Sequence, residues 1–313
     1  MRRFLRPLRS RGLATVSLAA ALAVGAGCGG GGSSGAGVAI DGSSTVGPYV
    51  TAAAEGFRKE QPDVNVTVGI SGTGGGFERF CRGETDLSNA SRPIKDEETA
   101  ECEKNGVEFI ELQVANDALT VVVNAENGWA TCLTVDELES MWKPGSKVRS
   151  WSQVRDGFPD VPLRLFGAGT DSGTFDYFTG EINGKEGASR TDYSASEDDN
   201  VTVQGVAGEK GGLGYFGFSY FEENQDKLNA VAIDGGGGCV APSSSAAQDG
   251  TYVPLARPLF VYAKKDSLDR AGVSDFLAYM LVNERAIAER ARFVPLNAEQ
   301  LDRAKAVLDE ATT

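Results

Sequence analysis

The sequence predicts an α/β fold of two lobes, in which mixed sheets flanked by helices enclose a cleft between the lobes. From Val38 onward, short apolar strands alternate with amphipathic helices, a pattern that builds a largely parallel sheet. Further along, two long apolar strands, starting near Ala118 and near Thr251, bracket a central insert. A chain that leaves one unit along one strand and returns along another forms two lobes joined by two crossings.

The first lobe is predicted over residues 38–117 and 255–313, and the second over 118–254. In the first lobe, VAIDG and VNVTVGI read as strands around the helix YVTAAAEGFRKEQ, SGTGGG as a loop, FERFCRG as a short helix and TDLSNAS as a strand. The second lobe contains TVDELESMW, LRLFGAGTDSGTFDYF and LGYFGFSYF. The returning strand is followed by the predicted helices SDFLAYMLVNERAIAERA and AEQLDRAKAVLDEA.

The N-terminal segment has the features of an export signal. Residues 1–27 combine arginines with the apolar run LATVSLAAALAVGAG, which is shorter than the ~18 apolar residues of a membrane-spanning helix. Because small residues precede Cys28, we expect a bacterial lipoprotein signal with Cys28 lipidated, a simple secretory signal being the alternative. Residues 28–37 then form a flexible Gly/Ser tether. The predicted location is extracytoplasmic, with the chain anchored to the cell membrane.

Composition excludes several classes of function. The chain contains no histidine, which removes Ser-His-Asp and Cys-His nucleophilic systems and the commonest ligand of transition metals. We therefore expect a non-enzyme with no metal and no cofactor. The formal net charge of -14 argues against nucleic acid as a partner. Any anion must be bound by local geometry rather than by overall charge.

The cysteines other than Cys28 are even in number, which in an exported chain suggests two disulfides. Three pairings are possible. We favour Cys81 with Cys102, because this pair closes a short loop, and Cys132 with Cys239 by elimination. The absence of a CxxC pair argues against metal binding by these thiols.

Three loops share one chemistry, since each combines small residues with hydroxyls just before a predicted helix. The amino end of a helix offers unpaired N–H groups and a partial positive charge, and Ser or Thr hydroxyls add donors. A plain helix cap is the alternative for any one loop, but three such loops in one two-lobed chain favour a shared anion site. The candidate residues are Ser43, Ser44 and Thr45; Ser71, Gly72 and Thr73; and Ser172, Gly173 and Thr174.

Two charged residues are predicted to complete the site. Arg92 can form a paired hydrogen bond with an oxyanion, the alternative being a surface ion pair with Asp96 or Glu97. Asp86 can accept a hydrogen bond only from a ligand that still carries a proton, as monohydrogen phosphate does and sulfate does not. It would therefore reject sulfate, unless it is merely a loop cap.

The motifs DGSSTVGPYV, GISGTGGGFERF, DLSNASRPI and GTDSGTFDYF, in this order behind a lipoprotein-like signal, resemble the phosphate-binding proteins of bacterial high-affinity phosphate ABC importers, the PstS family. The resemblance covers nearly the whole mature chain. It implies a type II periplasmic-binding fold that closes on inorganic phosphate for delivery to ABC permease subunits. It also implies that the loop residues named above contact phosphate and that Asp86 reads its proton. Some members carry arginine where this chain has Ala168, so the clamp role is assigned to Arg92.

The sequence leaves three alternative functions open. The nearest are a binder of another tetrahedral oxyanion, namely molybdate, tungstate or sulfate, and a phosphate sensor without a transport role. An extracytoplasmic phosphatase is less favoured, because GTDSG does not match the nucleophile motif G-x-S-x-G and the phosphate-loop motif GxxxxGK[ST] is absent. We expect the receptor to act as a monomer.

Overall fold

The computed structural model describes residues 37–170, 172–196 and 198–313. The predicted signal, Cys28 and nearly all of the tether lie outside the described residues. The helices are α1 (Gly47–Glu60), α2 (Gly72–Cys81), α3 (Asp96–Lys104), α4 (Val135–Trp142), α5 (Gly173–Asn183), α6 (Asp199–Gly208), α7 (Phe218–Glu223), α8 (Ser244–Gln248), α9 (Ala271–Val282), α10 (Glu284–Arg290) and α11 (Ala298–Ala311). The strands are β1 (Gly37–Gly42), β2 (Asn65–Val68), β3 (Leu87–Ala90), β4 (Phe109–Asn124), β5 (Cys132–Thr134), β6 (Arg164–Ala168), β7 (Ser194–Ser196), β8 (Gly212–Gly217), β9 (Leu228–Ala230), β10 (Ala232–Asp234), β11 (Cys239–Val240) and β12 (Ala256–Lys264).

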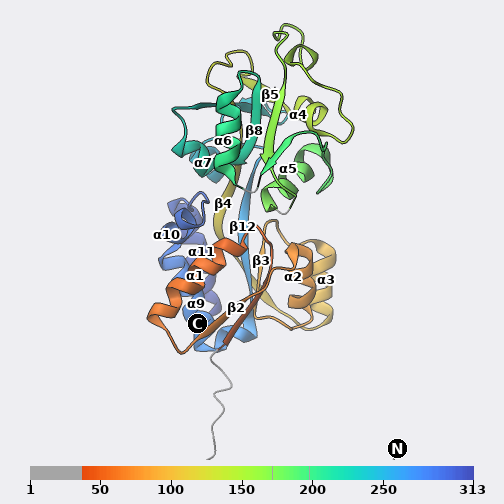
Figure 1. Cartoon of the computed structure of the whole chain (residues 1–313). Helices are drawn as coiled ribbons and strands as arrows, with labels where there is room; N and C mark the ends of the chain where they lie inside the picture. Colours follow the sequence, from red (N-terminus) through yellow and green to blue (C-terminus); the bar gives the residue numbers. More distant parts are fainter. Residues whose placement is uncertain (1–36, 171, 197) are drawn as a thin grey trace, which may run out of the picture. The chain divides into compact units, whose positions relative to one another are not determined.

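A nine-stranded mixed sheet organises the fold, in the order β2-β1-β3-β12-β4-β8-β6-β7, with β9 also paired to β4. The strands β1, β2 and β3 are parallel, as are β6, β7 and β8, whereas β12 and β4 run antiparallel to their neighbours. Figure 1 shows β4 and β12 extending through the middle, with helices gathered around the sheet on either side of them. The predicted mixed α/β architecture with two long crossing strands is therefore confirmed.

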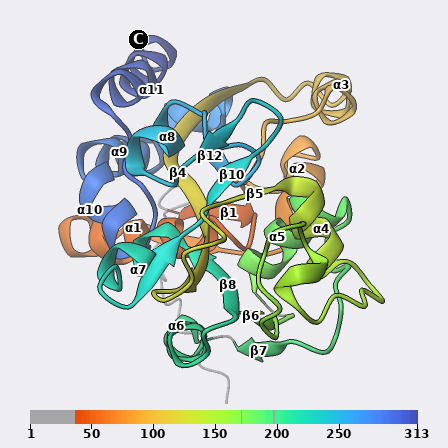
Figure 2. The same ribbon diagram turned by 90° about the horizontal axis from the view of Figure 1, so that it is seen from above.

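Side-chain alternation along β12 explains why its residues 259–263 are all apolar or aromatic. Leu259, Val261 and Ala263 belong to the cluster that contains residues of α1 and α9, while Phe260 and Tyr262 pack with residues of α2 and α3. Successive side chains of a strand point to opposite faces, so helices cover both faces of this part of the sheet. Figures 1 and 2 agree, because α1, α9, α10 and α11 lie on one side of it and α2 and α3 on the other.

The buried apolar residues form two main clusters. One draws its fully buried members from 38–115 and 259–308, and the other from 119–255. We propose that these clusters are the cores of the two predicted lobes, with one difference, since Leu255 was predicted in the first lobe and packs in the second cluster. Within the described residues, the chain passes from the first cluster to the second along β4 and returns along β12.

Both disulfides have the favoured pairing. Cys81 at the end of α2 is bonded to Cys102 in α3, and Cys132 in β5 is bonded to Cys239 in β11. In the part of the chain that the structure describes, no helix combines the length and the apolar character that crossing a membrane requires.

Two local predictions were wrong. The segment Gly72–Gly76 was expected to be a loop, but α2 begins at Gly72 and includes these glycines. A Cβ on Gly76 would lie 2.4 Å from the Cα of Gly42, so the close approach of α2 to β1 requires glycine despite its poor helix propensity. The long helix predicted after β12 is interrupted at Asn283, which separates α9 from α10.

Candidate functional site

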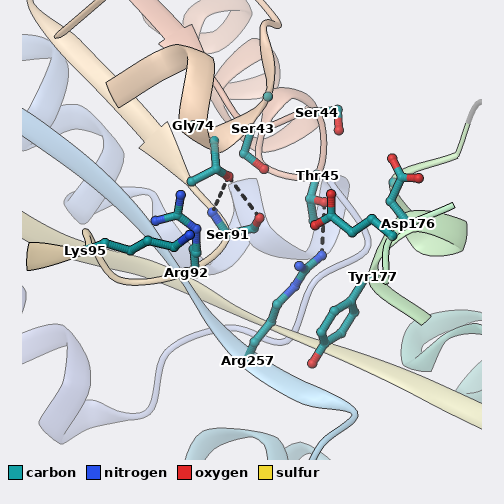
Figure 3. A pocket seen from close by; sticks show the side chains of 14 residues that line it. Ser43, Ser44, Thr45, Gly74, Ser91, Arg92, Lys95, Asp176, Tyr177 and Arg257 are labelled. Atoms are coloured by element: carbon teal, nitrogen blue, oxygen red, sulfur yellow. Dashed lines mark hydrogen bonds between the residues drawn. The ribbon is translucent and has the colours of Figure 1, made fainter. Parts of the chain in front are cut away.

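A polar cavity of about 460 Å³ opens where β1 and β3 end. Figure 3 shows how its side chains approach one another from several elements. The lining residues are Ser43, Ser44, Thr45, Gly72, Thr73, Gly74, Ser91, Arg92, Lys95, Gly173, Asp176, Tyr177, Glu186 and Arg257. Seven of the eleven predicted site residues are among them: Ser43, Ser44, Thr45, Gly72, Thr73, Arg92 and Gly173.

The first loop is fixed against the end of β3. Gly42 has a φ of +147°, and a Cβ there would lie 2.1 Å from the carbonyl oxygen of Asn89. Ser43 donates its N–H to that same oxygen at 2.9 Å, and the Asn89 side chain donates back to the Ser43 carbonyl at 3.1 Å. This double link holds the chain at the strand end, so that Ser44 and Thr45 reach the cavity.

The second loop contributes only part of what was predicted. Ser71 donates both its N–H and its hydroxyl to Oδ1 of Asp41, at 2.9 and 2.8 Å, and it does not line the cavity. Thr73 does line it, and its Oγ1 lies 3.1 Å from Oγ of Ser91 and accepts the N–H of Ser91 at 3.3 Å. The start of α2 is therefore tied to the end of β3 at the cavity wall.

The third loop meets the first loop directly. A Cβ on Gly173 would lie 3.0 Å from Oγ1 of Thr45. Ser172 caps α5 by accepting the N–H of Thr174 at 3.2 Å. Ser172 and Thr174 line an adjoining cavity of about 230 Å³, which shares Ser44, Thr45 and Gly173 with the first. Loops that are more than a hundred residues apart in the sequence thus face one another.

The predicted role of Asp86 is wrong, because Asp86 lies at the other end of β3. It precedes Leu87, the first residue of the strand, and the cavity follows Ala90, the last. Its carboxylate accepts the N–H of Ala39 at 2.9 Å and the hydroxyl of Ser267 at 3.0 Å, and it forms an ion pair with Arg270. Burial raises the pKa of Asp86. The hydrogen bonds to its carboxylate and the charge of Arg270 together lower the pKa by more than burial raises it, so the net change is downward.

Arg92 lies at the cavity wall but its guanidinium is engaged. Nη1 and Nη2 donate to the two carboxylate oxygens of Glu98 at 2.8 and 2.7 Å. The sequence suggested Asp96 or Glu97 as the alternative partner, and the structure shows Glu98 instead. Burial raises the pKa of Glu98, but the bonds from Arg92 and from the N–H of Lys95 lower it overall.

Sequence reasoning missed Arg257, which enters the cavity from β12. Its Nη2 donates to Oγ1 of Thr45 at 3.0 Å and its Nε to Oδ2 of Asp117 at 3.2 Å. Its guanidinium carbon lies 3.5 Å from the centre of the Tyr177 ring. Figure 3 shows Arg257 between Thr45 and Tyr177. A lone arginine inside an otherwise apolar strand was the available signal, because a charge in such a place needs partners.

The cavity also contains two carboxylates that the sequence analysis did not single out, Asp176 and Glu186. Burial raises the pKa of Asp176, and the neighbouring charge of Glu186 raises it further. Lys95 is a further cation at the wall. Among the described residues there is no group of three or more side chains of the metal-binding types that could hold a metal ion.

Hydroxyls, helix amino ends and paired cations around one small polar cavity suit an anion that accepts many hydrogen bonds. With this sheet topology, they define a solute-binding protein of the two-lobe type.

Comparisons with known proteins identify the family. The model of the PBP superfamily domain matches residues 29–284. Protein SphX of Synechococcus elongatus is 46% identical over 298 residues, which cover 94% of this chain and 88% of SphX. The phosphate-binding protein PstS of Staphylococcus saprophyticus is 39% identical over 272 residues, which cover 86% and 83%. The crystal structure of a possible phosphate binding protein from Planctomyces limnophilus matches with a TM-score of 0.85 and 47% identity, over 88% of this chain and 99% of that one. The chain belongs to the PBP superfamily and, within it, to the PstS family of phosphate-binding proteins, which confirms the resemblance seen in the sequence.

Proposed function

We propose that this protein is an extracytoplasmic receptor that captures inorganic phosphate between its two lobes and delivers it to an ABC permease. The observation that carries the proposal is the meeting of Thr45 and Gly173 at one polar cavity, because these residues come from the two proposed lobes. Relatives that carry the name phosphate-binding protein support phosphate as the ligand.

Phosphate would be held by donors rather than by net charge. The hydroxyls of Ser44, Thr45 and Thr73 lie at the cavity wall, and the first residues of α2 and α5 also line the cavity. An oxyanion bound by both sets of donors links the lobes, so that binding favours the closed arrangement. No bond of the ligand is broken in this proposal.

Because Asp86 lies outside the cavity, another group must accept the hydrogen bond from the protonated oxygen of monohydrogen phosphate. We assign this role to Asp176, with Glu186 beside it, since both carboxylates line the cavity. A carboxylate facing an oxyanion without a proton is left unpaired, and its charge repels the ligand. Sulfate is therefore disfavoured.

The membrane context is also proposed. Cys28 would carry the lipid anchor, and the 28–37 tether would let the receptor reach permease subunits from the membrane surface. Mass spectrometry of the mature N terminus tests the lipidation. Loss of phosphate uptake on deleting the gene, restored by the intact gene, separates a transport receptor from a sensor.

Calorimetric titration of the purified protein with phosphate, sulfate and molybdate tests the ligand. We expect phosphate to bind and to raise the unfolding temperature, with a gain of about 2.7 kcal/mol at a concentration of 100 times Kd. Sulfate at the same concentration should stabilise the protein far less. Tighter binding of sulfate or molybdate would assign a different oxyanion, and no binding of any of the three would refute the proposal.

A further inference from the structure

The arginine best placed to bind the ligand lies outside both segments that the sequence analysis considered, those of Arg92 and Ala168. We propose that Arg257, on the crossing strand β12, supplies the charged hydrogen-bond donors to phosphate, in place of Arg92. This inference rests on the proposed function and names the residue that gives the same site its charged clamp.

The guanidinium of Arg257 is held in one orientation from three directions. Its Nε donates to Asp117, which is its direct partner in the pairing of β12 with β4. Its flat face lies 3.5 Å from the centre of the Tyr177 ring, and Nη2 donates to Oγ1 of Thr45. A guanidinium fixed in this way loses little conformational entropy when it binds a ligand.

The terminal nitrogens of Arg257 face the ligand-binding loops. An arginine side chain has five N–H groups, and the bonds to Asp117 and Thr45 use two of them. Because the bond to Asp117 comes from Nε, the terminal fork is directed to the Thr45 side. Thr45 accepts from this fork, so its own hydroxyl proton is left for another acceptor, such as a phosphate oxygen.

Arg92 is arranged in the opposite way. Both of its terminal nitrogens donate to Glu98, and Nη1 also donates to the carbonyl of Pro93 at 3.1 Å. These bonds use three of its five N–H groups, against two for Arg257, and tie both terminal nitrogens to one carboxylate, so this fork is less free to bind a ligand. At Ala168, where some members of the family were expected to carry arginine, this chain has a buried residue without a polar side chain. Arg257 fills the role that neither position serves.

Phosphate affinity measured by calorimetry tests the assignment with three matched Arg→Lys variants. Arg257→Lys keeps the charge beside Asp117 but loses the fork, and we expect it to bind phosphate on the order of 10- to 100-fold more weakly. Arg92→Lys should change the affinity only a few-fold. Arg155→Lys is the control, because Arg155 also pairs with a carboxylate, that of Glu137, and lies 4.9 Å from a ring, that of Phe158, but does not line the cavity.

A chemical rescue separates contact with the ligand from a purely structural role. The double variant Arg257→Ala with Asp117→Asn removes the guanidinium without leaving a buried, unpaired carboxylate. We expect millimolar guanidinium to restore part of its lost phosphate affinity. Wild-type affinity in Arg257→Lys, a larger loss in Arg92→Lys, or a lower affinity that guanidinium does not rescue would each overturn the proposal. These outcomes differ from a failure of the proposed function itself, because in that case the unmutated protein would bind no phosphate.

Discussion

One buried carboxyl, that of Glu284, should make the stability of the fold decrease as pH rises. Glu284 is 2% exposed at the start of α10, and its Oε1 accepts the N–H of Leu296 at 2.7 Å. Burial raises its pKa from 4.5 to about 7. The bond from Leu296 and the charges of Arg285 and Lys305 lower the pKa, and the charge of Glu289 raises it, but each of these effects is smaller than that of burial.

The direction of this pH dependence follows from comparing the folded and unfolded states of the protein. Below the unfolded pKa of 4.5 the carboxyl is protonated in both states, and its contribution to stability is fully present. Between 4.5 and about 7 the unfolded chain releases a proton that the folded chain keeps, so the free energy of unfolding falls with rising pH. At 1.36 kcal/mol for each pKa unit, the total loss is about 3 kcal/mol and is complete above the folded pKa.

Urea unfolding of the ligand-free protein across this pH range measures the effect. Glu284→Gln keeps the acceptor for the N–H of Leu296 and removes the titration. We expect its advantage over the unmutated protein to grow from under ~1 kcal/mol near pH ~5 to about 3 kcal/mol near pH ~8. Glu289→Gln, on the exposed side of the same helix, should change the free energy of unfolding by less than about 0.5 kcal/mol throughout. Parallel stability curves for Glu284→Gln and the unmutated protein would refute the reasoning.

Three further predictions concern the disulfide, the close approach of α2 and the carboxylate in the cavity. Replacing Cys132 and Cys239 by Ser opens a link between residues 107 apart, which should lower the free energy of unfolding by up to about 5 kcal/mol in urea; a loss below that of the shorter disulfide would contradict this. Gly76→Ala would place a Cβ 2.4 Å from a Cα at the end of β1 and should cost about 1–3 kcal/mol and weaken phosphate binding, whereas Gly128→Ala, with open space around it, should do neither. Asp176→Asn should narrow the preference for phosphate over sulfate by about tenfold, measured as the ratio of the two affinities, and an unchanged ratio would remove Asp176 from that role.

Much of the fold could be predicted because burial leaves a clear pattern in the sequence. Most residues of β4 and β12 are buried, and each strand contains a long, mainly apolar stretch that the sequence analysis read as a strand. The start of α2 could not be predicted in the same way. Its glycines disfavour a helix locally, and the contact that requires glycine at position 76 is with β1, which is a tertiary feature.

Site residues could be predicted where the direction of parallel strands places them. They could not be predicted where their position depends on how distant elements pack together. Loops after parallel strands lie at one edge of a sheet, and this places Thr45 and Thr73 at the same cavity. Asp86 was predicted to complete the site, but it directly precedes the first residue of β3 and therefore lies at the end of that strand opposite the loops. Arg257 belongs to a strand rather than to a loop, so its approach to Thr45 depends on how β12 lies in the sheet.

The pairing of cations in the cavity explains how a chain of net charge -14 can hold an anion. Arg257 lies against Asp117 and Arg92 against Glu98, so each guanidinium is nearly neutralised by its own carboxylate. Burial raises the pKa of Asp117 in spite of Arg257, which shows how costly that carboxylate would be without its partner. The pair therefore holds the guanidinium in place and adds little net charge. On this argument affinity comes from fixed donors at short range, and it does not require an electropositive surface.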